Sequence, residues 1–164
     1  MSNVWFCSDL HFGHKNIEKF RGEFVESEED NRQLIKDDWN AVVQKRDHVY
    51  VLGDACFTME TIGDFRELPG TKTLIRGNHD LLDTQVYLKE FDGVYGLLKY
   101  KEFWLSHAPI HPDELRGRVN LHGHVHYSSI EDAGYYNCCC ENLWKNFGRC
   151  LVSLDQLRKV LKGE

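Results

Sequence analysis

Seven residues spread along the chain carry side chains that bind divalent metal ions: Asp9, His11, Asp54, Asn78, His107, His124 and His126. They lie in five segments in which an apolar run meets polar residues and, in several cases, a glycine; the segments are 4–14, 49–54, 73–80, 103–109 and 119–126. Buried strands that end in such residues bring carboxylate, amide and imidazole groups together at one edge of a sheet. These nitrogen and oxygen donors suit two divalent cations and a phosphate.

The spacing within the segments favours shared ions. Asp9 and His11 are two residues apart, as are His124 and His126, so each pair can point the same way on a strand or just past its end. The carboxylate of Asp54 has two oxygens and can bridge two metals, whereas a neutral imidazole cannot. Taken alone, each motif also has a structural explanation, such as a helix N-cap, a turn or exposed histidines on an edge strand. Chance is a poor explanation for the occurrence of all these motifs in one chain.

With one shared carboxylate, seven residues supply two metal sites. The donor set favours Mn²⁺, is compatible with Fe, Zn²⁺, Co²⁺ or Ni²⁺, and suits Ca²⁺ less well. Two-metal sites clamp the attacking and leaving oxygens of a phosphoryl group. The predicted reaction is therefore hydrolysis at phosphorus by in-line attack of a metal-bridging hydroxide, without a covalent phospho-enzyme. His79, beside Asn78, is placed to meet the substrate rather than a metal.

The length and composition predict a single domain, residues 1–164. The formal net charge of the chain is −6. This charge disfavours broad binding to a nucleic-acid backbone, although bound dications would reverse the local field. No apolar run is long enough to span a bilayer, and residues 1–10 do not resemble a signal peptide, so we expect a cytoplasmic protein without membrane contacts. The six cysteines form no CxxC pair, and we expect them to be reduced and buried.

Apolar periodicity predicts alternating strands and helices in the first half and a strand-rich second half. The strands are predicted at 4–8, 48–52, 72–76, 94–100, 102–106, 118–122 and 135–141. Helices are predicted at 28–45, with Ser27 as N-cap, and at 154–162, with Ser153 as N-cap. This order indicates an α/β fold whose second half is more antiparallel.

The five segments, in this order, resemble the calcineurin-like metallophosphoesterases. The family pattern is D-x-H, G-D, G-N-H-D/E, a lone His and G-H-x-H. This chain has D-L-H at 9–11, G-D at 53–54, G-N-H-D at 77–80, His107, and G-H-V-H at 123–126. The match runs through residues 4–126, and its D-L-H-F-G-H start at 9–14 is similar to the small bacterial and phage branch.

The resemblance implies a four-layer α/β/β/α sandwich of two mixed sheets flanked by helices, with a dinuclear centre. It assigns one metal to Asp9, His11, Asp54 and His126, and the other to Asp54, Asn78, His107 and His124. In this assignment Asp54 is the bridge and a catalytic residue, and His79 protonates the leaving oxygen.

The chain departs from the family at two points. Many members have G-D-x-x-D, whose second Asp orients the catalytic histidine, but here Phe57 stands at that position. The arginine with which protein phosphatases grip the phosphate just after that Asp is also missing. The candidate substrate contacts are His14, Arg76, Arg116 and Arg118, each with an alternative structural role.

We therefore expect a dinuclear metal-dependent phosphoesterase that acts on phosphodiesters or small phosphorylated metabolites. A phosphodiesterase is favoured, as a monomer or a homodimer. The alternatives are a non-catalytic protein-interaction module on the same fold and a nuclease. A nuclease would need a basic groove near the metals, formed for example by Arg21, Lys45, Arg66, Arg116 and Arg118.

Overall fold

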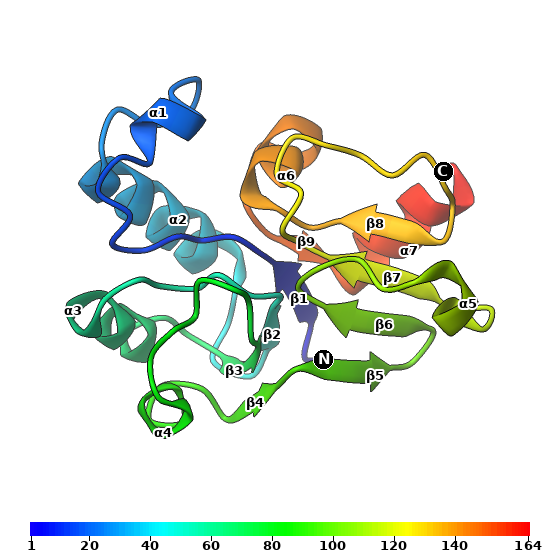
Figure 1. Cartoon of the computed structure of the whole chain (residues 1–164), viewed down its shortest axis with the longest axis horizontal. Coiled ribbons are helices and arrows are strands. Elements are labelled where there is room, and N and C mark those ends of the chain that lie inside the picture. Colours follow the sequence, from blue (N-terminus) through cyan, green and yellow to red (C-terminus); the bar gives the residue numbers. More distant parts are fainter.

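The computed structural model describes residues 1–164 and contains two mixed sheets flanked by helices (Figure 1). The first sheet has the strand order β4-β3-β2-β1-β9, and the second has the order β5-β6-β7-β8. The strands are β1 (Val4–Cys7), β2 (His48–Val51), β3 (Thr71–Ile75), β4 (Gly93–Tyr95), β5 (Leu97–Tyr100), β6 (Phe103–Ser106), β7 (Val119–His122), β8 (Tyr135–Asn137) and β9 (Val152–Ser153). The α/β class with two mixed sheets agrees with the architecture that the resemblance implies.

The helices gather on two sides of the paired sheets. In Figure 1, α1 to α4 lie on the left beside the first sheet, α6 lies at the top centre, and α5 and α7 lie on the right near the second sheet. Their bounds are α1 (Glu18–Arg21), α2 (Glu28–Val42), α3 (Met59–Ile62), α4 (Thr84–Tyr87), α5 (Pro112–Leu115), α6 (Cys140–Phe147) and α7 (Leu154–Lys162), with a 3₁₀ turn η1 (Gly63–Arg66). None of these helices combines the length and the apolar character needed to cross a membrane.

Alternate residues of the first sheet pack on opposite sides, as expected for strands. Trp5 and Cys7 of β1 join a cluster with Ile35 and Trp39 of α2. Phe6, between them, joins a second cluster that contains side chains of β6 and β7 in the other sheet. The first sheet is therefore buried on both faces, by helices on one side and by the second sheet on the other.

The two predicted long helices are confirmed. The Ser27 side chain accepts a hydrogen bond from the Asp30 backbone N–H at the start of α2. Ser153 and Gln156 form a reciprocal capping box at the start of α7. The helix α2 ends at Val42, a few residues before the predicted end.

Two predicted strands are wrong in extent. Residues 94–100 form two strands, because the chain leaves the first sheet after β4 and enters the second at β5, on either side of Gly96. The segment 135–141 leaves the sheet at Asn137, whose side-chain oxygen accepts the Cys139 N–H at 2.8 Å, and α6 begins at Cys140. The sequence analysis missed α6, although Leu143 and Trp144 mark its buried face.

The prediction of a more antiparallel second half is confirmed, because both antiparallel pairs, β5–β6 and β1–β9, involve strands of that half, whereas the pairs among β1 to β4 are all parallel. The pairs β6–β7 and β7–β8 are nevertheless parallel. The segments 107–118 and 123–134 provide the long connections that parallel neighbours need. The six cysteines are free and buried, as expected.

The cluster between the sheets gives a test of the architecture. Phe103 of β6 is fully buried against residues of both sheets. We expect Phe103→Ala to lower the free energy of unfolding by about 3–5 kcal/mol, because the ring leaves a cavity. Urea denaturation followed by circular dichroism measures this change. Leu81→Ala is the control, since Leu81 is 81% exposed, and we expect it to change stability by less than about 0.5 kcal/mol.

Candidate metal centre

Most of the candidate ligands lie just beyond the carboxyl ends of parallel strands. Asp9, Asp54 and Asn78 follow β1, β2 and β3, which are parallel neighbours in the first sheet. His107 and His124 follow β6 and β7, which are parallel neighbours in the second. Parallel strands end at the same edge of their sheet, and the facing sheets therefore deliver these side chains to one place.

The backbone at this edge is unusual. Seven residues other than glycine have positive φ angles, and five of them are candidate ligands: Asp9 (58°), His11 (55°), Asp54 (52°), His124 (71°) and His126 (50°). Such angles are uncommon for residues with side chains, and they concentrate at functional sites. Both pairs lie just past the ends of β1 and β7, which is one of the two placements that the spacing allowed. Both members of each pair adopt the left-handed conformation.

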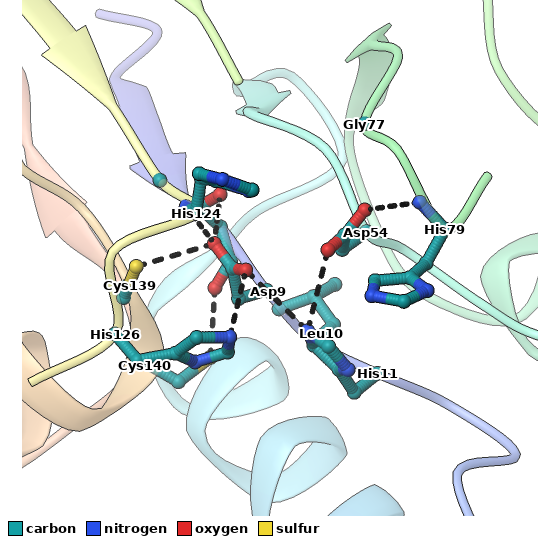
Figure 2. Close-up of polar contacts among 12 residues, drawn as sticks. Asp9, Leu10, His11, Asp54, Gly77, His79, His124, His126, Cys139 and Cys140 are labelled. Atoms are coloured by element: carbon teal, nitrogen blue, oxygen red, sulfur yellow. Dashed lines mark hydrogen bonds and ion pairs between the residues drawn. The ribbon is translucent and has the colours of Figure 1, made fainter. Parts of the chain in front are cut away.

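The carboxylate of Asp9 is fully buried and lies at the centre of Figure 2. Its Oδ2 atom is 2.7 Å from the Ser8 Oγ, accepts the His124 backbone N–H at 2.9 Å and accepts the Cys139 thiol at 3.2 Å. Burial alone would raise the pKa of Asp9. The hydrogen bond from His11 and the charge of nearby imidazoles outweigh burial and hold the pKa well below its usual range.

One set of donor atoms converges on the Asp9 side. The His11 Nε2 lies 3.4 Å from Asp9 Oδ1 and 3.5 Å from Asp54 Oδ2. The His126 Nε2 lies 3.6 Å from the same Asp9 oxygen. Figure 2 shows these contacts as a chain of dashed lines from His126 through Asp9 and His11 to Asp54.

A second set converges on the other side of Asp54. The His107 Nε2 lies 3.3 Å from Asp54 Oδ2 and 2.8 Å from Asn78 Oδ1. The His124 Nδ1 lies 3.0 Å from the same Asn78 oxygen and 3.2 Å from His107 Nε2. Burial lowers the pKa of His107, but the hydrogen bond to Asp54 and the charges of Asp9 and Asp54 raise it to about 9.

These distances fit divalent metals. Metal–ligand bonds of about 2.1 Å place neighbouring donor atoms roughly 3.0–3.4 Å apart, and the contacts described here lie between 2.8 and 3.6 Å. Asp54 Oδ2 is close to both sets, which suits a bridging carboxylate. Asp9, His11 and Asp54 form a candidate metal-binding group, as do Asp9, His126 and Cys139.

His79 lies beside the ligands and not among them. Its backbone N–H donates to Asp54 Oδ1 at 2.8 Å, while its ring faces the cavity described below. The ring of Phe57 stacks on the His79 ring, with centroids 5.1 Å apart and planes at 27°. A hydrophobic ring therefore contacts His79 from the position at which many family members have an aspartate.

Asp80 ties two ligand loops together, a role that the sequence analysis did not assign. Its carboxylate accepts the backbone N–H groups of Asp54, Ala55 and Gly77, all at 2.8 Å. Burial raises the pKa of Asp80, although these three hydrogen bonds oppose the shift. The G-N-H-D motif contained the signal, because it placed this carboxylate three residues after Gly77.

A buried ion pair supports His126. Glu141 Oε1 accepts a hydrogen bond from Arg21 Nε at 2.6 Å and lies 3.1 Å from His126 Nδ1. Arg21 is fully buried, and its Nη1 donates to Asn31 Oδ1 at 2.9 Å, while its Nη2 donates to the Asp9 carbonyl. No local sequence signal indicates this pair, because Arg21 and Glu141 are 120 positions apart.

The predicted substrate contacts have different environments. His14 lines the cavity beside His79 and His126. Arg76 lines a second cavity, but its guanidinium donates to Asp80 O, Thr84 Oγ1 and Leu82 O. That engagement favours the structural alternative for Arg76.

Arg116 and Arg118 lie near α5 and line neither cavity. Arg116 is exposed, and its Nη2 lies 3.4 Å from Glu114 Oε2. The structure therefore does not bring these two arginines to the ligand set.

Gly123 is required by the close approach of two loops. A Cβ at this position would lie 1.9 Å from Ser8 Oγ and 2.3 Å from Asp9 Oδ2. We expect Gly123→Ala to displace Asp9 and to weaken metal binding about 10–100-fold, as measured by calorimetric titration with Mn²⁺. Gly63→Ala is the matched control, because a Cβ there meets nothing within 4 Å. Equal metal affinities for the two variants would contradict this role of Gly123.

Comparisons with known proteins find relatives of this chain. A 35% identical protein of Methanocaldococcus jannaschii, described as uncharacterized, aligns over 144 residues, which are 84% of this chain and 77% of that protein. The gene 66 protein of Mycobacterium phage L5 is 42% identical over 85 residues, covering 49% of this chain and 41% of the phage protein. The chain therefore spans less than half of that phage relative.

A crystal structure of a protein of unknown function from Aquifex aeolicus matches with a TM-score of 0.77 at 25% identity, over 98% of this chain and 100% of that chain. A family model described as calcineurin-like phosphoesterase matches residues 2–160. The ligand loops, both sheets and the supporting residues all lie within that range. The chain therefore belongs to the calcineurin-like phosphoesterase family.

Proposed function

We propose that this protein is a dinuclear, metal-dependent phosphoesterase that hydrolyses phosphodiesters or small phosphorylated metabolites. The observation that carries the proposal is the convergence of two donor sets on one shared oxygen, Asp54 Oδ2, which lies 3.5 Å from His11 Nε2 and 3.3 Å from His107 Nε2. Family membership supports phosphoester hydrolysis as the reaction class.

The two sets would hold one metal each. Asp9, His11, Asp54 and His126 would form one site, and Asp54, Asn78, His107 and His124 the other. When bound, the two ions polarise phosphoryl oxygens and lower the pKa of a water that attacks phosphorus. Mn²⁺ is the favoured ion because the set consists of imidazoles, carboxylates and an amide.

His79 is the proposed general acid. Its backbone is fixed by the hydrogen bond to Asp54, and its ring faces the cavity into which a leaving group would extend. A protonated imidazole at this point donates its proton to the departing oxygen, so that no high-energy alkoxide is released. Phe57 holds the ring by stacking instead of by a hydrogen bond.

A small substrate is favoured over a nucleic acid. A nuclease would need cationic side chains near the metals to bind the nucleic-acid backbone. Arg21, however, is buried against Glu141, and Arg66 pairs with Glu90. Arg116 pairs with Glu114 and lines neither cavity. Three of the five cations considered for such a groove are therefore engaged elsewhere.

The proposal predicts metal-dependent turnover. Metal-stripped protein supplied again with Mn²⁺ should hydrolyse bis-p-nitrophenyl phosphate, and Asp54→Asn should lower kcat/KM about 100-fold or more, since it weakens both sites at once. The ratio of this diester activity to the activity on p-nitrophenyl phosphate measures the substrate preference.

Asp155→Asn is the control, because Asp155 is exposed on α7, away from the ligand loops. It should retain full activity. Bound metal without turnover of either ester would argue against the proposed reaction. Absence of both bound metal and turnover would favour the interaction-module alternative.

The stacking of Phe57 on His79 predicts that the effect of a Phe57 substitution on kcat depends on the leaving group. Phe57→Ala should free the His79 ring and lower kcat for phenyl phosphate about 10-fold, because its leaving group needs a proton. The change for p-nitrophenyl phosphate should be smaller, since its leaving group departs readily as an anion. Phe57→Tyr keeps the ring and should preserve both rates. An equal loss for the two esters, at unchanged metal content, would show that Phe57 does not act through His79.

A further inference from the structure

A cavity of about 590 Å³ opens directly beside the candidate metal centre. Its inner end is formed by His11, His79 and His126. Glu141 and Ile17, both buried, also line the cavity, and its outer part is formed by the more exposed His14, Lys19, Phe20 and Tyr127. A phosphoester whose phosphate lies at the metals would therefore extend its organic group past His79 into this cavity, whose size is typical of small-molecule sites.

The outer part presents two large rings to solvent. Phe20 is 63% exposed and Tyr127 is 47% exposed. The two residues lie 107 positions apart in the sequence and are linked by the Tyr127 hydroxyl, which donates to the backbone carbonyl of Phe20 at 3.1 Å. Single exposed apolar residues are common, but two exposed rings that line one cavity form a surface for a flat ligand.

Neighbouring side chains hold both rings in place. The His14 ring meets Phe20 edge to face, with centroids 5.6 Å apart. The Lys145 ammonium lies 4.6 Å from the Tyr127 ring centroid, a cation–π contact. Ile17, which is buried, adds an apolar contact within the cavity. The mouth is thus a positioned aromatic surface.

A cavity on the other side of the ligand set differs in character. It has a volume of about 470 Å³ and is lined by Asn78, His107 and His124 together with Arg76, Leu97 and Ile110, among others. No phenylalanine, tyrosine or tryptophan lines it. The aromatic surface is therefore confined to the side on which His79 lies.

We propose that Phe20 and Tyr127 form a subsite for the base of a nucleoside phosphoester, with the nucleoside as the leaving group. This proposal rests on the proposed phosphoesterase function and specifies its substrate. Aromatic side chains bind bases by stacking, which tolerates any base because every base has a flat π-face. Lys19, at the same cavity, adds a positive charge near the ligand.

The test compares two phosphomonoesters that differ only in the base. Calorimetric titration of the Mn²⁺-loaded protein with adenosine 5′-monophosphate and with ribose 5-phosphate should give at least about 10-fold tighter binding of the nucleotide. Phe20→Ala and Tyr127→Ala should each reduce this ratio several-fold and leave the affinity for ribose 5-phosphate unchanged. Tyr127→Phe, which keeps the ring, should retain the ratio.

Tyr95→Ala is the matched control, because Tyr95 is also 47% exposed but lines neither cavity. It should bind both ligands as the parent protein does. Equal affinities of the parent protein for the two ligands would overturn the subsite. The same result would follow if Tyr95→Ala reduced the affinity ratio as much as Phe20→Ala and Tyr127→Ala do. Failure of the phosphoesterase proposal gives a different result, namely no ester hydrolysis by a metal-loaded protein.

Discussion

The buried carboxylate of Asp9 is the group around which the two halves of the molecule meet. Burying a carboxylate away from water costs free energy unless hydrogen-bond donors surround it. Here the donors come from distant segments, since the His124 N–H follows β7 and the Cys139 thiol precedes α6. Arg21 donates to the backbone carbonyl of Asp9 and anchors Glu141 on α6. Satisfying one carboxylate thus fixes how the second sheet and α6 lie against β1.

The left-handed backbone at the candidate ligands is the cost of this arrangement. Left-handed geometry costs roughly 1–2 kcal/mol per residue with a side chain, and aspartate and histidine tolerate it better than most residues. Five such residues at one edge are stable only because the surroundings hold them. Asp80 does so for Asp54, whose N–H it accepts, and Gly123 allows the approach of its loop to Asp9. The strain is therefore concentrated where donor atoms must converge.

The sequence predicted which side chains converge at this edge, because each motif is a local signal at the end of an apolar strand. It also predicted α2 and α7, whose serine caps and apolar periodicity are local too. It could not predict the Arg21–Glu141 pair or the Phe57–His79 stack, because both depend on how distant segments pack. The parallel pairing of β6, β7 and β8 was missed for the same reason, since strand composition does not specify the neighbour or its direction.

The loops that carry candidate ligands also line the cavity beside them. The segment between β1 and α2 contributes His14 and Phe20 to one cavity, and the segment after β7 contributes Tyr127. These segments also carry His11 and His126, so the ligands and the cavity walls are parts of the same loops. The net charge of −6 does not oppose an anionic substrate, because field strength at the phosphate depends on the nearby ions. The backbone of these two loops therefore positions both the candidate ligands and the aromatic rings at the cavity mouth.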